Sequence, residues 1–410
     1  MKYIVFLGDG MADLPLPQYD NRTPLMIAAK PGMDAIASQG LAGMVKTVPD
    51  TLAPGSDTAN MSVMGFDPEK YYSGRSPLEA VSMGIKLADD DIAFRCNLVT
   101  LSGLDTETDI SMEDYSSDEI TSEEAAQLIA SLQNKLSDSS ISFHAGKSYR
   151  HCVVWHGGPS DMKLTPPHDI LTQKIENWLP QGNGSDKIMQ LMLSSREILK
   201  NHPVNLDRVN RGLRPANSIW IWGQGTRPQL PVISDTYGLK GAVISAVDLI
   251  FGLGICAGME LIEVPGATGN IHTNFSGKAD AAIDAFARGV DYVYLHLEAP
   301  DECGHRAETE NKIKAIELLD SKIIKPVWDY LERNRKETGE DYRVMVLPDH
   351  PTPLKLRTHT SDPVPFAIFS SDGKLLHKPA AAYDEASCSK TGLLIDPGHE
   401  LFGKFVRGDF

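Results

Sequence analysis

The chain has 410 residues, of which 41% are hydrophobic and 23% are charged, as in an ordinary soluble globular protein with two domains or one large insertion. A formal net charge of -16 argues against a general nucleic-acid or anionic-membrane binder, although metals and local arginines can still create a site for a phosphorylated substrate. We expect a cytoplasmic protein with free thiols. The five cysteines are scattered and show no CxxC spacing, and the sequence has neither a signal-peptide pattern nor an apolar run of membrane-spanning length.

The first predicted strand covers residues 2–7 and runs directly into Gly8-Asp9-Gly10. A helix is predicted from Pro31 to about Gly40, and a second strand over 44–48. The turn PGSDTAN then leads into a predicted helix over 59–64, with the Ser56 hydroxyl beside backbone N–H groups and the positive helix end. This turn could cradle a phosphate, but taken locally an N-cap role for Ser56 or Asp57 is the simpler interpretation.

Residues 65–76 are rich in turn-forming residues, and we predict a hinge there. In the block that follows, strands are predicted over 93–99, 152–155 and 218–222, and helices over 124–136 and 187–200. This block collects arginines, whereas the acidic and histidine residues described below all lie outside it. We therefore predict a discontinuous domain of residues 1–76 and 231–410, into which a domain of residues 77–230 is inserted.

Strands and helices alternate again in the last part of the chain, which predicts an α/β class of fold. The predicted strands cover 239–245, 260–264, 290–295, 342–347 and 365–369, and a helix covers 247–257. A further helix is predicted from an apolar stripe at Ile313, Ile316, Leu319, Ile323, Val327 and Leu331. The sequence beyond these elements reads as a polar tail.

Acidic residues and histidines follow three of the predicted strands, where open α/β sheets place their ligands. These residues are Asp9, Asp301, His305, Asp349, His350 and, in a loop further on, His359. If one helical turn forms after the strand at 290–295, Asp301 and His305 lie on the same helix face because they are four residues apart. Three carboxylates and three imidazoles could hold two divalent ions, and these O and N donors suit Mn²⁺ or Zn²⁺.

The chain resembles a known family through five motifs that occur in this order: GDGMAD, PGSDTAN, APDECGH, PDHPTP and THTSDPVPF. It resembles the cofactor-independent (2,3-bisphosphoglycerate-independent) phosphoglycerate mutases, in the archaeal-type branch of the alkaline phosphatase superfamily. The resemblance covers essentially the whole chain. It implies an alkaline-phosphatase-like sheet with helices on both faces and an inserted, smaller α/β domain that binds substrate. It also implies a glycolytic isomerase that interconverts 3-phosphoglycerate and 2-phosphoglycerate through a phosphoserine.

The resemblance further implies roles for individual residues. Those that match the ligands of one metal are Asp9, Ser56, Asp349 and His350, with Ser56 also the phosphoryl acceptor. Those that match the ligands of the second metal are Asp301, His305 and His359. Mn²⁺ and Zn²⁺ are the ions we expect first, with Co²⁺ and Mg²⁺ as alternatives.

The resemblance also implies groups that hold the phosphoserine and the substrate. Lys240 matches the lysine that steadies the phosphoserine, and we place it with Ser56, Arg150 and His151 in the catalytic group. The other substrate-binding candidates of the inserted domain are Arg95, Arg211, Arg214 and Arg227. Guanidinium groups suit this role because they hold a carboxylate or a phosphate through two parallel hydrogen bonds.

Other functions stay open at this point. The stretches YRHC, NHPVN, ANSIWIWGQG and VPGATG are similar to a subgroup of the same branch that is proposed to phosphorylate homoserine with ATP, using the same serine and metals. ATP motifs do not decide between the two, because residues 145–148 (AGKS) only look like the end of a P-loop, with Ile141 where a glycine is needed. A phosphatase is less favoured, since a simple hydrolase needs no arginine-rich second domain. We favour the mutase.

Overall fold

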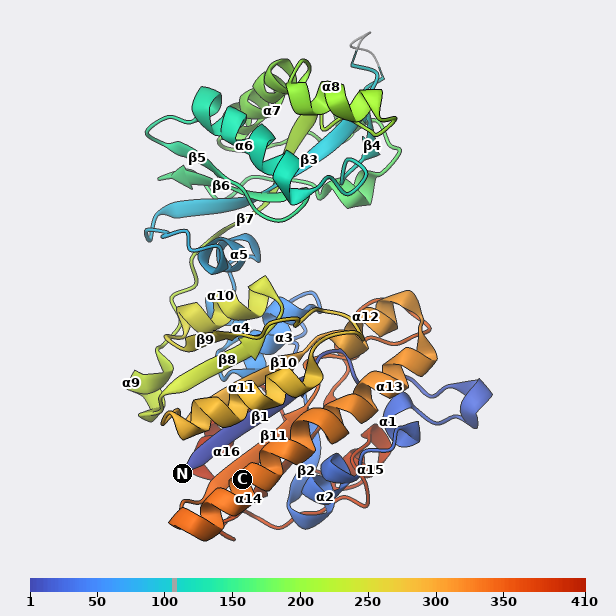
Figure 1. Cartoon of the computed structure of the whole chain (residues 1–410), viewed down its shortest axis with the longest axis vertical. Coiled ribbons are helices and arrows are strands. Elements are labelled where there is room, and N and C mark those ends of the chain that lie inside the picture. The colour runs from blue at the N-terminus through green and yellow to red at the C-terminus, as the bar shows by residue number, and fades with distance from the viewer. Residues whose placement is uncertain (105–108) are drawn as a thin grey trace. The chain divides into compact units, whose positions relative to one another are not determined.

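The computed structural model describes residues 1–104 and 109–410. It divides into two compact units, unit 1 of residues 1–72 and 229–410 and unit 2 of residues 73–228 (Figure 1). The sequence placed the first boundary after residue 76 rather than 72 and the second after residue 230 rather than 228. The functions assigned to the two parts stay predictions.

Unit 1 is built on a sheet in the order β13-β2-β12-β11-β1-β10-β8-β9. Its strands are β1 (Lys2–Gly8), β2 (Leu41–Val45), β8 (Gly241–Ser245), β9 (Glu260–Glu263), β10 (Tyr292–Leu297), β11 (Tyr342–Leu347), β12 (Val364–Ser370) and β13 (Leu394–Ile395). Only β12 among the described strands of this sheet runs antiparallel to its neighbours. β1, β10 and β11 are buried along their whole length, which explains why they read as continuous apolar runs in the sequence.

Helices cover both faces of this sheet, so the predicted α/β class is confirmed (Figure 1). The main ones are α2 (Pro31–Gln39), α3 (Ser56–Val63), α10 (Asp248–Cys256), α11 (Phe275–Ala287), α12 (Ala299–Arg306), α13 (Thr309–Leu319), α14 (Lys325–Thr338) and α16 (Glu400–Arg407). Short helices are α1 (Pro24–Ile27), α4 (Pro68–Tyr71), α9 (Ile233–Tyr237) and α15 (Glu385–Ser389). None of the described helices is long and apolar enough to cross a bilayer.

Four local predictions differ from the structure. The second strand lies at 41–45 rather than 44–48, because Leu41 to Val45 pair with β12. The helix predicted over 59–64 already begins at Ser56. The helix predicted from the apolar stripe is not one continuous α-helix, because a wider π-helical segment, Asp320–Ile324, lies between α13 and α14. The end of the chain is the amphipathic α16 rather than a polar tail, because it buries Leu401, Phe402 and Phe405.

Unit 2 contains an antiparallel sheet whose central strand β3 (Asp91–Ser102) pairs with β4 (Ser111–Asp114), β6 (Arg150–His156) and β7 (Ser218–Thr226). β5 (Ile141–His144) pairs with β6. Its helices are α5 (Ser76–Ser82), α6 (Ser122–Leu136), α7 (Ser185–Leu199) and α8 (Pro203–Asn210). Leu128, Leu132 and Met192 from α6 and α7 pack with Phe94 and Ile219 into a core that belongs to this unit alone.

Candidate metal centre

The polar residues predicted from the strand ends lie together at the carboxyl edge of the unit 1 sheet. Asp9 follows β1 directly, and Asp349 and His350 follow β11 after a single proline. Asp301 and His305 lie on α12, which begins two residues after β10 ends, so the expected helical turn is present. Because β1 pairs in parallel with both β10 and β11, these three segments leave the sheet side by side.

Asp9, Asp349 and His350 form the first candidate ligand group. All three are fully buried, and one ligand atom from each lies within 4.8 Å of the others. Asp349 accepts hydrogen bonds from the Gly10 N–H and the His350 N–H through Oδ1, at 3.1 and 2.9 Å. Oδ1 of Asp9 has no hydrogen-bond partner in the described part of the chain. A buried carboxylate oxygen without a donor is costly, and a bound cation would satisfy it.

Ser56 completes this group from the first residue of α3. Its Oγ lies 3.1 Å from Nε2 of His350, and one helical turn later Asn60 donates to the Ser56 carbonyl at 2.8 Å and to Oδ2 of Asp349 at 2.7 Å. Asn60 itself is held by the Tyr294 hydroxyl, which donates to its Oδ1 at 2.5 Å. The start of α3 is therefore fixed against β10 and the loop after β11, with the Ser56 hydroxyl facing the ligand group.

Asp301, His305 and His359 form the second candidate group. The Nε2 atoms of the two imidazoles lie 2.9 Å apart, and each is within 3.3 Å of an oxygen of Asp301. Nδ1 of His305 lies 3.0 Å from the Arg357 carbonyl, which can only accept, so Nδ1 carries the proton. A neutral His305 then presents the lone pair of Nε2, as metal-bound histidines do.

In the absence of a cation, burial and the neighbouring charged groups shift the pKa values of these carboxylates and imidazoles. Burial raises the pKa of Asp9 well above its usual range, and the neighbouring carboxylates of Asp349 and Asp301 raise it further. Burial alone would also raise the pKa of Asp301, but hydrogen bonds with His305 and His359 hold it well below its usual range. The hydrogen bond to Asp301 raises the pKa of His305 to about 9. Crowded carboxylates beside imidazoles are the donor set that divalent ions prefer, so the residues fit two such ions.

His296 and Lys278 support the first group from outside, and sequence reasoning assigned them no firm role. Nε2 of the buried His296 lies 2.8 Å from Oδ2 of Asp9, and its Nδ1 lies 3.1 Å from the Ser245 hydroxyl. Because an ionised Asp9 only accepts, His296 donates to it from Nε2. Lys278 donates to the His296 carbonyl at 2.8 Å. The position of His296 at the end of β10 could have indicated its role. The contact of Lys278 could not have been predicted, because it joins residues far apart in the chain and follows no local sequence pattern.

Lys240 does not lie at this centre. It precedes β8, and its carbonyl accepts hydrogen bonds from Asp291 N and Tyr292 N at the amino-terminal edge of the sheet. The length of a five-residue strand, about 16 Å, separates this edge from the one that carries Ser56. The structure therefore does not bring Lys240 together with Ser56, because its motif lies at the opposite end of β8, and its contact with a phosphoserine stays a prediction.

The candidates of unit 2 do not form one cluster with a common orientation. Arg95 and Arg150 lie on one face of the β3–β6 pair, and His151 lies on the opposite face. Arg95 makes a two-pronged ion pair with Glu79, and its guanidinium lies 4.8 Å from the centre of the Trp222 ring. Arg150 is exposed and lies over the Tyr149 ring.

His151 is buried, and burial lowers its pKa to about 3. Its Nδ1 accepts from the Gly146 N–H at 3.0 Å, so Nε2 carries the proton, and the described residues offer Nε2 no partner. Arg211 pairs with Glu124 and Arg214 with Asp118, so both guanidiniums already have carboxylate partners. Arg227 follows β7 and is half-buried. The substrate roles of these residues stay predictions.

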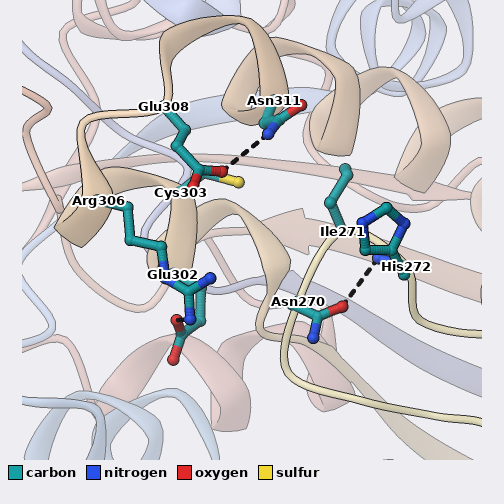
Figure 2. A pocket seen from close by; sticks show the side chains of 8 residues that line it. All are labelled: Asn270, Ile271, His272, Glu302, Cys303, Arg306, Glu308 and Asn311. Carbon is teal, nitrogen blue, oxygen red and sulfur yellow. Dashed lines mark hydrogen bonds and ion pairs between the residues drawn. The ribbon is translucent and has the colours of Figure 1, made fainter.

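Helix α12 also lines a small cavity of about 180 Å³, shown in Figure 2. Its lining residues are Asn270, Ile271, His272, Glu302, Cys303, Arg306, Glu308 and Asn311. Arg306 pairs with Glu302 at 2.9 Å, and Asn311 donates to Glu308 at 2.8 Å. Because these polar groups already satisfy one another, we assign no ligand to this cavity.

Comparison with known proteins identifies the family of the chain. The family model for 2,3-bisphosphoglycerate-independent phosphoglycerate mutase matches residues 37–205. A protein of that name from Methanothrix thermoacetophila is 49% identical over 408 residues, which cover 100% of both chains. The chain belongs to this mutase family. A more distant member, 2,3-bisphosphoglycerate-independent phosphoglycerate mutase 1 from Archaeoglobus fulgidus, is 34% identical, with 98% of this chain and 96% of that protein covered.

Two solved structures share the fold of this mutase family member over nearly its full length. The PH0037 protein from Pyrococcus horikoshii superposes with a TM-score of 0.81 at 26% identity, covering 99% of this chain and 96% of that one. The cofactor-independent phosphoglycerate mutase from Thermoplasma acidophilum gives a TM-score of 0.67 at 24% identity, with 100% of each chain covered. These relatives give the homoserine kinase alternative no support.

Proposed function

We propose that this protein interconverts 3-phosphoglycerate and 2-phosphoglycerate without added 2,3-bisphosphoglycerate, by moving the phosphoryl group onto and off Ser56. The observation that carries the proposal is the Ser56 hydroxyl at the start of a helix, 3.1 Å from His350 in the buried group of Asp9, Asp349 and His350. Family membership supports the substrate class, since the relatives are named for this reaction.

The reaction needs an activated serine and a neutralised phosphoryl group. Two divalent ions, bound by Asp9, Ser56, Asp349 and His350 and by Asp301, His305 and His359, would lower the pKa of the serine hydroxyl and offset the phosphoryl charge. The O and N donors favour Mn²⁺ or Zn²⁺, with Co²⁺ and Mg²⁺ as the ions to compare. The first backbone N–H groups of α3 add positive potential beside Ser56.

The phosphoryl transfer takes place in two steps, both at Oγ of Ser56. In the first step Oγ of Ser56 loses its proton and bonds to phosphorus, while the bond between phosphorus and the glycerate oxygen breaks and that oxygen gains a proton. In the second step the other glycerate hydroxyl gives up its proton and bonds to phosphorus, while the bond between phosphorus and Oγ breaks and Oγ regains a proton. Glycerate must stay bound and water must stay out between the steps, or the phosphoserine would hydrolyse. Arg150 and the other basic residues of unit 2 are our candidates for holding it.

The test is a pair of assays on the metal-loaded enzyme. One tube receives 3-phosphoglycerate, with 2-phosphoglycerate as the readout, and the other receives ATP and homoserine, with phosphohomoserine measured by mass. We expect turnover in the first tube without nucleotide or bisphosphoglycerate. Phosphohomoserine formed without mutase turnover would replace the proposal with a kinase, and release of inorganic phosphate alone would replace it with a phosphatase.

The role of Ser56 has its own prediction. Ser56→Ala should abolish mutase turnover because no oxygen remains to accept phosphorus, and it should keep at least the metal held by Asp301, His305 and His359. The control is Ser62→Ala in the same helix, which should stay active. Metal content and turnover are measured on both variants, and an active Ser56→Ala enzyme would refute the phosphoserine route.

A further inference from the structure

Thr352 lies between the two candidate metal groups and touches both. It is fully buried, its Oγ1 lies 2.5 Å from Oδ1 of Asp301, and the same Oγ1 lies 3.3 Å from Nδ1 of His350. Asp301 belongs to the second group and His350 to the first. A single hydroxyl is therefore in hydrogen-bond contact with one ligand of each ion.

The directions of these two hydrogen bonds follow from the chemistry of the groups. A carboxylate that binds a metal is ionised and can only accept, so the one hydroxyl hydrogen of Thr352 points to Asp301. The Thr352 oxygen then accepts from Nδ1–H of His350. This fixes the tautomer in which Nε2 of His350 carries a lone pair, and Nε2 is the atom that faces Ser56.

The backbone around Thr352 holds its hydroxyl in this place. The Thr352 N–H donates to the Ala12 carbonyl at 3.2 Å, and the Thr352 carbonyl accepts from Nζ of Lys312 at 2.8 Å. Two neighbouring glycines make room for it. A Cβ at Gly10 would lie 2.5 Å from Thr352 Oγ1, and a Cβ at Gly304 would lie 2.5 Å from the Thr352 carbonyl oxygen.

We propose that Thr352 is a positioning residue shared by both metal sites, so that loss of its hydroxyl weakens the binding of both ions at once. It orients the Asp301 carboxylate at one site and selects the His350 tautomer at the other. The inference rests on the proposed function only in taking the two groups as metal sites. The proposal predicts that removal of this one oxygen atom lowers the affinity of both sites for divalent ions.

Thr352→Val tests this proposal because it keeps the shape of the side chain and removes the hydroxyl. Calorimetric titration of the metal-free protein with Mn²⁺ should show two ions bound by the wild type. In Thr352→Val both affinities should fall about 10- to 100-fold, the range found when groups that orient metal ligands are removed. His305→Ala, which removes a ligand of the second site alone, assigns the two binding steps.

Thr352→Ser is the conservative control and should restore both affinities to within a few-fold of the wild type, since it keeps the hydroxyl. If either binding step is unchanged in Thr352→Val, or if Thr352→Ser binds no better than Thr352→Val, the shared role is wrong. The melting temperatures of the metal-free variants are measured in parallel. A loss of affinity that only follows a loss of fold would also overturn the proposal.

A measurement on the wild type makes the test independent of how the variants fold. Long-range ¹H–¹⁵N spectra should show His350, assigned through His350→Gln, as the tautomer with its proton on Nδ1. A proton on Nε2 would refute the proposed direction of the hydrogen bonds. If the wild type binds no divalent ion at all, the proposed function fails instead, so the two failures are distinguishable.

Discussion

The buried lysine of helix α11 links the stability of the protein to pH. Lys278 is only 1% exposed, and burial lowers the pKa of its ammonium group to about 8 even though Glu298 opposes this shift. In the unfolded chain the same group holds its proton up to about pH 10.5. The unfolded state therefore binds more protons between these values, and stability rises as the pH increases from 8 towards 10.5.

We expect this single group to add about 2 kcal/mol to the free energy of unfolding between pH 7 and pH 9.5, given a folded pKa of about 8. Urea unfolding of the wild type and Lys278→Met at both pH values checks this, because the methionine cannot titrate. The wild type should gain about 2 kcal/mol relative to Lys278→Met. Lys374→Met, which removes an exposed lysine, is the control. An equal gap at both pH values for Lys278→Met would contradict the prediction.

Arg150 is a candidate substrate-binding residue of unit 2 whose side chain is open to solvent. It is exposed at the start of β6, and the contact found for its guanidinium is the face of Tyr149, 5.1 Å from the ring centre. Arg150→Ala should raise the KM for phosphoglycerate by a factor of about 10 to 100, the cost of one charge-assisted hydrogen bond. Metal content should stay at the wild-type value.

The control for Arg150 is Arg288→Ala, which removes an exposed arginine that pairs with Glu260 in unit 1. Steady-state kinetics should show a normal KM for this variant. An unchanged KM in Arg150→Ala would remove Arg150 from the set of substrate-binding residues.

At the scale of elements, helix α13 is tied to the loops of the metal centre by one buried ion pair. Nζ of Lys312 donates to Oδ2 of Asp13 at 2.7 Å, and both side chains are fully buried. Asp13 also accepts from the Leu354 N–H, so the pair joins the loop after β1, the loop after β11 and α13. The same lysine holds the carbonyl of Thr352.

Lys312→Met should destabilise the protein by about 3 to 5 kcal/mol, because it leaves the Asp13 carboxylate buried without a cationic partner. Adding Asp13→Asn to this variant should recover part of the loss, since the unpaired charge is then gone. Lys325→Met breaks the exposed pair with Asp329 and should cost less than about 1 kcal/mol. Chemical unfolding of the four proteins checks the order. A Lys312→Met variant as stable as Lys325→Met would show that the pair does not hold these elements.

The elements that could be predicted from the sequence are those with a strong local pattern. β11 covers the predicted residues 342–347, and β1 extends the predicted 2–7 by one residue, because strands buried on both faces are continuous apolar runs. The residues that follow such strands must meet at one edge of a parallel sheet. This is why Asp9, Asp301 and Asp349 could be grouped from the order of residues alone.

The contacts that could not be predicted are made between residues far apart in the chain. One of them joins the π-helical segment between α13 and α14 to α2, where the Asp320 carboxylate accepts from the Gly32 and Met33 N–H groups. Thr352 shows no local pattern either, since its partner Asp301 comes from another loop. The position of Lys240 could not be predicted from its local motif either, because the direction of β8 places it at the amino-terminal edge of the sheet.

At the scale of the whole molecule, the insertion begins and ends at neighbouring positions. Ser73 donates a hydrogen bond to the Thr226 carbonyl, so the first residue of unit 2 lies beside its last strand. Unit 2 has its own apolar core, and each described candidate metal ligand lies in unit 1. These are the features of a domain that can be cut out without breaking either part.

Residues 73–228 expressed alone should fold and unfold cooperatively, and unit 1 with a short Gly/Ser linker in their place should still bind two divalent ions. Circular dichroism with thermal unfolding checks the first part and metal titration the second. A fragment of residues 73–210 is the control, because it lacks β7, a partner of the central strand β3, and should not fold. An excised unit 2 without a cooperative transition would show that it depends on unit 1.

Strand β1 leaves the ribosome long before the two strands that flank it. Its partners β10 and β11 are made only after the whole of unit 2, and at 5 to 20 residues per second this takes roughly 15 to 60 s. Unit 2 is continuous and can fold during this interval, while the apolar residues of β1 have no sheet to enter. Tyr3 is covered last, when its ring meets Phe405 on α16. Newly made chains truncated before α16 should therefore depend on chaperones that hold exposed apolar segments.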